Sequence, residues 1–339
     1  MYCEQISVRR YDVCMERNYA ISVLIPCHST HYLAEALESI DNQTLDKHEF
    51  EVILVTDRVS PQVVKSILSR TTLNYRVFVS ETPGIVSALN FGLSQIKSDY
   101  VARMDEDDRM LTSRLEKQLN FLNEHPEVVA VGGQLRLIDE KGTPLGYSSY
   151  DKEVGLDFVS LFTSSPIAHP AAMFRLQPVL SLQGYRDFLP EDWDLWTRLR
   201  EIGYIRNLSE TILEYRIHPN QLSRQTFYAK VLGRRLVAVS HFVRKDEGKD
   251  QPKSNLNRLE WLEETEKYLR ATSPEFVRYE EYFQKIDEME SLLRTNPLAT
   301  RVVRVLEFIA LNPVASFSYI WRNLKRKISI SLRASCKSS

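Results

Sequence analysis

The sequence predicts an α/β protein in which helices flank a mostly parallel sheet, with a helical extension at the C-terminal end. The first observation is a series of short apolar runs, of which 20–25 (AISVLI) and 50–55 (FEVILV) are the clearest. Such runs are typical of strands that are buried on both faces of a parallel sheet. The second observation is that segments with helical spacing separate these runs, which predicts strand–helix–strand crossovers. The third is the segment 225–295, which is rich in Glu, Lys and Arg and typical of charged helices.

The first strand and helix set the pattern for this half of the chain. The apolar run at 20–25 is β-branched and is closed by Pro26, which predicts the end of a strand. The following segment, 31–42, carries Leu33, Leu37 and Ile40 at helical spacing. This spacing predicts an amphipathic helix that covers the sheet.

The later elements are predicted on the same grounds. The expected strands are 50–55, 75–79, 100–104 and a strand that begins at 128–131, and the expected helices are 61–69, 84–96 and 113–124. A Pro-Gly turn opens the helix at 84–96. In the helix at 113–124, Leu115, Leu119 and Leu122 share one face. The section 132–220 is less regular and holds two dense polar motifs.

Composition limits the class of protein and its partners. The chain has 339 residues and a net charge of -1, so global charge indicates no nucleic-acid partner. We expect an N-terminal extension at 1–19, a main domain at 20–224 and a helical region at 225–339. Four scattered cysteines, none in a CxxC pair, predict free thiols in a reducing compartment. No signal-peptide core and no apolar run of about 18 residues are found, so we expect a cytoplasmic protein without a transmembrane helix.

The strongest chemical signal is the acidic run at 105–108 (DEDD), directly after a predicted strand. Clustered carboxylates repel one another, and Mg²⁺ or Mn²⁺ binds to one or two carboxylates together with phosphate oxygens. Asp105 and Asp107 are therefore candidate ligands of a cation that neutralises a departing diphosphate. The alternative is a solvated acidic turn or a helix N-cap cluster.

Other polar residues also follow predicted strands. Pro26, His28 and Asp57 are close in sequence to strand ends, and such ends meet at one edge of a parallel sheet, where ligands bind. The Asp57 carboxylate could accept hydrogen bonds from a base or a ribose. The alternative is an aspartate that starts a turn.

The segment 191–196 (EDWDLW) interleaves acidic residues with tryptophans. In a helix, Leu195 and Trp196 would be buried and Asp192 would lie at the helix start. Asp192 is then a candidate general base for an acceptor hydroxyl, and Trp193 could stack on a sugar. The alternative is that the acidic residues complement the helix dipole.

Two histidines complete the candidate set. His169 precedes Pro170, and His218 precedes Pro219. A structural role is the alternative for both, and His218 could instead be an additional metal ligand.

Together these motifs resemble those of the family 2 glycosyltransferases, which are inverting enzymes with a GT-A fold. The matching segments, in family order, are 22–26 (SVLIP), 37–44 (LESIDNQT), 102–108 (ARMDEDD), 114–118 (RLEKQ), 167–170 (IAHP) and 191–196 (EDWDLW). One departure is 56–60 (TDRVS), which keeps a single carboxylate where the family often has two. No Gln-x-x-Arg-Trp segment is present, which argues against a processive synthase.

The resemblance implies direct displacement with inversion, in surface-polysaccharide synthesis. The implied donor is a nucleotide sugar, expected to be UDP-linked, and the implied acceptor is a hydroxyl of a glycan that is expected to be lipid-linked. The implied donor-binding residues are Pro26, His28, Asp57, Arg103 and Asp105, and the implied acceptor-side residues are His169, Glu191 and Trp193. Asp192 takes the position of the catalytic base.

Two other function classes and one membrane hypothesis stay open at this point. A sugar-1-phosphate nucleotidyltransferase would need a Gly-rich basic loop near residues 26–29, which is absent, and a non-catalytic assembly partner would be expected to lose an acidic site residue. The segment 302–332 is basic and carries interspersed apolar residues. It could lie on an anionic membrane at the inner face of the plasma membrane, or it could pack on the protein.

Overall fold

The computed structural model describes residues 19–154, 165–187, 191–219, 221, 227–248, 258–274, 276–277 and 280. The chain divides into two compact units. The first consists of the described residues within Met1–Val154, Pro166–Asp187 and Arg198–Gln221, and the second of those within Gly155–Ser165, Phe188–Thr197 and Leu222–Ser339.

The first unit is built on a mixed sheet in which nine strands are described, in the order β3-β2-β1-β4-β8-β6-β9-β5 with β7 paired to β6. The strands are β1 (Ile21–Cys27), β2 (Phe50–Thr56), β3 (Tyr75–Val79), β4 (Tyr100–Arg103), β5 (Arg109–Met110), β6 (Val128–Ile138), β7 (Pro144–Ser148), β8 (Met173–Arg175) and β9 (Tyr204–Arg216). The four strands β3, β2, β1 and β4 are parallel. The predicted α/β class is thereby confirmed.

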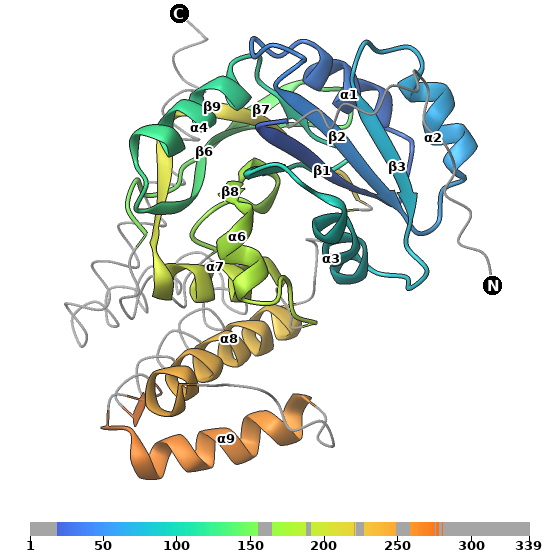
Figure 1. Ribbon diagram of the computed structural model, residues 1–339. Coiled ribbons are helices and arrows are strands. Elements are labelled where there is room, and N and C mark those ends of the chain that lie inside the picture. The colour runs from blue at the N-terminus through green and yellow to red at the C-terminus, as the bar shows by residue number, and fades with distance from the viewer. Residues whose placement is uncertain are drawn as a thin grey trace, which may run out of the picture. The chain divides into compact units, whose positions relative to one another are not determined.

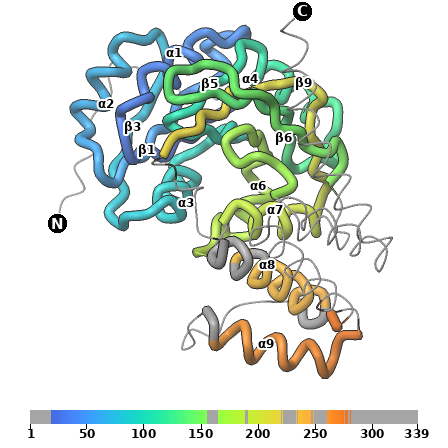
Figure 2. Tube along the Cα trace, turned by 180° about the vertical axis from the view of Figure 1, so that it is seen from behind, coloured from blue at the N-terminus to red at the C-terminus, as the bar shows by residue number. Residues whose placement is uncertain are grey.

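Helices cover both faces of the parallel half, because alternate residues of each buried strand face opposite sides. The helices of this half are α1 (Leu33–Asp41), α2 (Pro61–Leu68), α3 (Ile85–Gln95) and α4 (Arg114–Glu124). Val23 and Val52 belong to one core cluster with apolar residues of α1, α2 and α4. Leu24 instead lies against Gly92 of α3. Figures 1 and 2 show α1 and α2 on one side of the sheet and α3 on the other.

The first strand extends further than the sequence predicts. Pro26 was expected to close it, but β1 continues through Pro26 to Cys27, and Pro26 pairs with Val55 of β2. Pairing between β1 and β4 ends at Leu24, opposite Arg103. Pro26 therefore lies beyond the residues paired with β4, where a missing N–H leaves no gap in that ladder.

The second half of the sheet is mixed. β6 runs parallel to β9, whereas β8 is antiparallel to both β4 and β6, and β5 is antiparallel to β9. The strand predicted to begin at 128–131 is β6. The short helices η1 (His169–Ala171) and α6 (Leu176–Ser181) flank β8. Because β9 pairs with β5, the end of β9 at Arg216 lies close to the strand that follows the acidic run.

The second unit is helical where it is described. It holds the first residues of α7 (Glu191–Ile202), together with α8 (Phe227–Glu247) and α9 (Arg258–Thr272). The Nε of Arg235 on α8 donates to Glu266 on α9 over 2.9 Å, and the rings of Phe242 and Phe276 lie 5.5 Å apart. None of the helices in the described part of the chain combines the length and the apolar character needed to cross a membrane. The basic segment 302–332 lies outside the described residues.

Candidate active site

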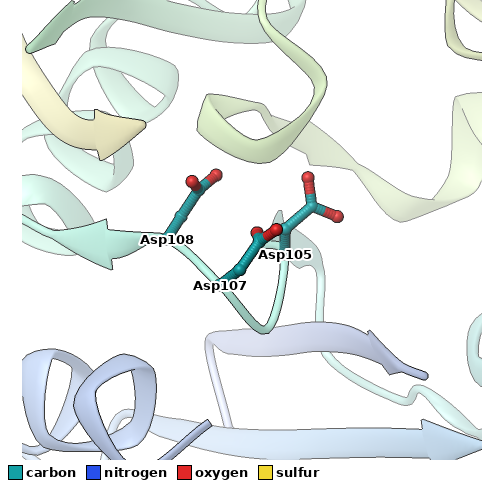
Figure 3. A group of neighbouring side chains, drawn as sticks. All are labelled: Asp105, Asp107 and Asp108. Atoms are coloured by element: carbon teal, nitrogen blue, oxygen red, sulfur yellow. The ribbon is translucent and has the colours of Figure 1, made fainter. Parts of the chain in front are cut away.

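Three aspartates converge on the tight turn between β4 and β5. Each of Asp105, Asp107 and Asp108 offers one carboxylate oxygen, and these oxygens all lie within 4.8 Å of one another. Figure 3 shows the three side chains projecting from this single turn. The sequence brings them together because β4 ends at Arg103 and β5 begins at Arg109, so the intervening residues must reverse within a short loop.

The electrostatics of this turn favour a bound cation. Burial, and then the charge of Asp105, raises the pKa of Asp107. Asp108 is completely buried, and burial together with Asp107 and Asp105 raises its pKa well above the usual range. Its Oδ2 has no hydrogen-bond partner among the described residues. Hard divalent cations bind such carboxylate oxygens, so the donor set fits Mg²⁺ or Mn²⁺.

Arg103 offsets part of this negative charge, and His218 lies beside a second aspartate. Nη2 of the buried Arg103 lies 2.5 Å from Oδ1 of Asp105. Nε2 of His218 lies 2.8 Å from Oδ2 of Asp107. The structure therefore brings Arg103, Asp105, Asp107 and His218 together, although they lie up to 115 positions apart in the sequence, as the numbering shows.

A second polar group follows β1 and β2 at the same edge of the sheet. Nδ1 of His28 lies 2.7 Å from Oδ1 of Asp57, and the backbone N–H of Gly84 donates to Oδ2 of Asp57 over 2.9 Å. Burial opposes ionisation of Asp57, but the Gly84 hydrogen bond and the His28 side chain outweigh it and lower the pKa. Gly84 has a φ of 117°, a conformation that favours glycine, so the turn that aims its N–H depends on this residue. Asp57 thus links three segments that line the edge.

Glu106 connects this group to the acidic turn. Its Oε1 accepts hydrogen bonds from the backbone N–H groups of His28, over 3.0 Å, and Ser29, over 3.2 Å. Burial, followed by the charge of Asp105, raises the pKa of Glu106 to about 7. The loop after β1 and the turn after β4 are therefore held together by one carboxylate.

A buried arginine stabilises the backbone next to the acidic turn. Arg114, at the start of α4, donates to the carbonyl oxygens of Pro170 (2.8 Å), Arg103 (2.8 Å) and Ala172 (3.2 Å). Its Nε donates to Gln118 over 3.0 Å. These bonds fix the end of β4, and with it the direction in which the acidic turn leaves the sheet.

His169 begins the short helix η1 and is buried. Its Nε2 lies 2.9 Å from the hydroxyl of Tyr185. Burial, followed by the charge of Arg103, lowers the pKa of His169 well below the usual range. A contact between His169 and an acceptor stays a prediction.

The predicted base and its neighbours lie in the second unit. Glu191 and Asp192 occupy the first turn of α7, where negative charge is favoured by the helix dipole. Oδ2 of Asp192 accepts a hydrogen bond from the hydroxyl of Ser165 over 3.2 Å. Trp193 and Trp196 are buried, with Trp193 only 7% exposed. The approach of Asp192 to the carboxylates therefore stays a prediction.

Three residues that contribute to the site were not assigned a role from the sequence. Asp108 stands next to the predicted pair, and its adjacency was the available signal. Glu106 and Arg216 were missed because their roles depend on contacts with distant segments, namely the loop after β1 and the turn at Asp107. No local pattern reveals such contacts.

The fold matches solved glycosyltransferases. The UDP-GlcNAc complex of S. aureus TarS superposes with a TM-score of 0.55 at 18% sequence identity, covering 88% of this chain and 83% of that chain. The UDP complex of the same protein gives a TM-score of 0.52 at 17% identity, covering 88% and 82%. The predicted GT-A type of fold is confirmed.

Sequence comparison gives the family. The profile of Glycosyl transferase family 2 matches residues 22–180. The O-antigen biosynthesis glycosyltransferase WbnJ of Escherichia coli is 35% identical over 206 residues, which are 58% of this chain and 80% of WbnJ. The amylovoran biosynthesis glycosyltransferase AmsE of Erwinia amylovora is 32% identical over 202 residues, 57% of this chain and 73% of AmsE. The chain belongs to glycosyltransferase family 2, and neither a nucleotidyltransferase nor a non-catalytic partner is favoured.

Proposed function

We propose that this enzyme transfers a sugar, with inversion, from a nucleotide-diphosphate donor to a hydroxyl of a glycan acceptor in surface-polysaccharide synthesis. The observation that carries the proposal is the cluster of three carboxylates at the sheet edge of a family 2 chain. The names of WbnJ and AmsE, which refer to O-antigen and amylovoran biosynthesis, support the polysaccharide context. A UDP-linked donor is the form that we propose to test first.

In this proposal Asp105 and Asp107 hold Mg²⁺ or Mn²⁺, with Asp108 beside them and His218 as a further ligand. The cation would supply positive charge for the departing diphosphate. Arg103 orients Asp105 through their 2.5 Å contact. Pro26 and His28 line the nucleoside pocket. Asp57 acts on that pocket through His28 and Gly84, because both of its oxygens are engaged by them.

The acceptor is proposed to bind on the other side of the reacting carbon. Asp192 takes the proton from the acceptor hydroxyl as that oxygen attacks the anomeric carbon. Glu191, Trp193 and His169 are the proposed acceptor-side residues. Alignment of both substrates by these groups supplies much of the rate.

The test is a panel of nucleotide sugars incubated with the full-length protein, with Mg²⁺, with Mn²⁺ and with EDTA. We expect metal-dependent release of a nucleoside diphosphate from one donor. Asp107→Asn should weaken metal-dependent donor binding, whereas Asp192→Asn should abolish transfer and leave donor binding nearly intact. Full activity in EDTA would refute the metal role, and lost donor binding in Asp192→Asn would remove that residue from the base role.

The cellular setting is a further part of the proposal. We place the enzyme in the cytoplasm, with residues 302–332 touching the inner face of the plasma membrane, where a lipid-linked acceptor would be found. Basic residues interspersed with apolar ones support this contact. Flotation with anionic liposomes, of full-length protein and of a form that ends at residue 301, tests it. Equal flotation of both forms would show that the segment is not the anchor.

A further inference from the structure

Arg216, at the end of β9, is a charged residue with no solvent exposure. Its backbone N–H donates to Oδ1 of Asp108 over 2.9 Å, and its Nε donates to the carbonyl oxygen of Asp107 over 2.8 Å. The main chain and the side chain of Arg216 therefore both donate hydrogen bonds to the acidic turn. Two residues further along, His218 reaches the Asp107 carboxylate.

The rest of the guanidinium is fixed from three further directions. Nη1 donates to the carbonyl oxygen of Glu140 over 3.0 Å, and Nη2 donates to Oε2 of Glu35 over 2.7 Å. The guanidinium carbon also lies 4.2 Å from the centre of the Tyr32 ring, a cation–π contact. Tyr32 in turn lies beside His218, with 5.4 Å between the ring centres.

This set of contacts requires an arginine. A guanidinium offers five donors in one plane and also stacks on aromatic rings, whereas a lysine ammonium is a compact charge with three donors. Arg216→Lys would keep the charge, but it could not reach Asp107, Glu140 and Glu35 together. Of the two bonds by which Arg216 itself holds the turn, the backbone bond to Asp108 would remain.

We propose that Arg216, stacked on Tyr32, is a positioning residue that fixes the spacing between Asp107 and His218 for cation binding. It is completely buried and acts through these two side chains. The inference rests on the proposed metal site. Groups that orient metal ligands change affinity by about 10- to 100-fold when they are removed.

The experiment measures Mn²⁺ affinity of the full-length protein by electron paramagnetic resonance, with the metal alone as probe. Arg216→Lys should weaken binding by about tenfold or more. Arg216→Lys combined with His218→Asn should be little worse than His218→Asn alone, because both changes disturb one unit. Transfer activity of Arg216→Lys should be restored by raising the Mn²⁺ concentration, which would not rescue a merely misfolded protein.

Arg109→Lys is the matched control. Arg109 also pairs with Glu35, at 3.6 Å, but no contact with Asp107 is described for it. Unchanged Mn²⁺ affinity in Arg216→Lys, or an equal loss in Arg109→Lys, would overturn the inference. Should Arg216→Lys fail to fold, Tyr32→Leu keeps Arg216, removes the ring that contacts both Arg216 and His218, and should still weaken Mn²⁺ binding; wild-type affinity there would overturn the inference too. A wild-type protein that binds neither Mn²⁺ nor any nucleotide sugar would instead refute the proposed function.

Discussion

Asp57 provides a sharp test of how the sheet edge is held together, because its two carboxylate oxygens are engaged by different segments. Asp57→Ala removes the acceptor of the Gly84 N–H and the partner of the His28 ring. A hydrogen bond to a charged group contributes about 1.5–3 kcal/mol, and His28 can recover part of its loss from water, because 22% of its side chain is exposed. We therefore expect Asp57→Ala to lower the free energy of unfolding by about 2–4 kcal/mol.

Asp57→Asn should cost much less, about 1 kcal/mol, because the amide oxygen can accept from Gly84 while the amide nitrogen donates to the other tautomer of His28. Urea denaturation of the two variants at neutral pH measures the difference. Equal stability of Asp57→Ala and wild type would refute the reasoning.

The pH dependence of the same comparison follows from the lowered pKa of Asp57. Because the folded pKa lies below the ordinary value of 3.8, the stabilisation is complete above that pH and is lost as the pH falls through the folded pKa. The stability gap between wild type and Asp57→Asn should therefore narrow below about pH 4. A gap that is constant with pH would show that the charge of Asp57 contributes nothing.

Three further changes test other parts of the structure. Arg114→Met removes the Arg114 donor to the carbonyl oxygen of Pro170 and one of two donors to that of Ala172, which keeps the Arg103 N–H, and should cost about 3–5 kcal/mol in urea denaturation; a cost below about 1 kcal/mol would contradict its supporting role. Glu106 has its pKa raised to about 7, so in EDTA its contribution to stability is greatest below pH 4.5 and declines as the pH rises to about 7. Glu106→Gln should flatten this decline by about 1–3 kcal/mol, whereas the exposed control Glu38→Gln should leave it unchanged. Gly92→Ala would place a Cβ 2.3 Å from Leu24 Cδ1 and should cost about 1–3 kcal/mol, read as a lower Tm; an unchanged Tm would mean that α3 shifts freely.

Much of the parallel half could be predicted because its signals are local. The expected helix at 113–124 corresponds to α4 (Arg114–Glu124), and the strand at 50–55 corresponds to β2 (Phe50–Thr56). Pro26 misled the prediction of where β1 ends, because whether a proline breaks a strand depends on the neighbouring strand. The mixed half was not predicted in detail, since β9 reaches β6 and β5 through pairings that no local pattern specifies.

The site, too, combines residues that a local sequence pattern reveals with residues that it does not. The acidic run is contiguous, so Asp105 and Asp107 were recognisable as a pair, and the structure adds Asp108 to them. The contact of His218 with Asp107 was suggested as shared metal binding, and the structure places the two side chains 2.8 Å apart. The Glu106 bonds to the loop after β1 were not foreseeable, because they depend on the depth at which two parallel strands end.

The acidic turn joins β4, in the parallel half, to β5, which lies at the far end of the strand order beyond β8, β6 and β9. The chain thus passes from one half of the sheet to the other through the residues proposed to bind the cation. An inserted or deleted residue here would change the register between the two halves of the sheet. It would also move the carboxylates away from one another. Evolutionary variation in length is therefore expected to spare this junction and to accumulate in connections such as the β6–β7 hairpin.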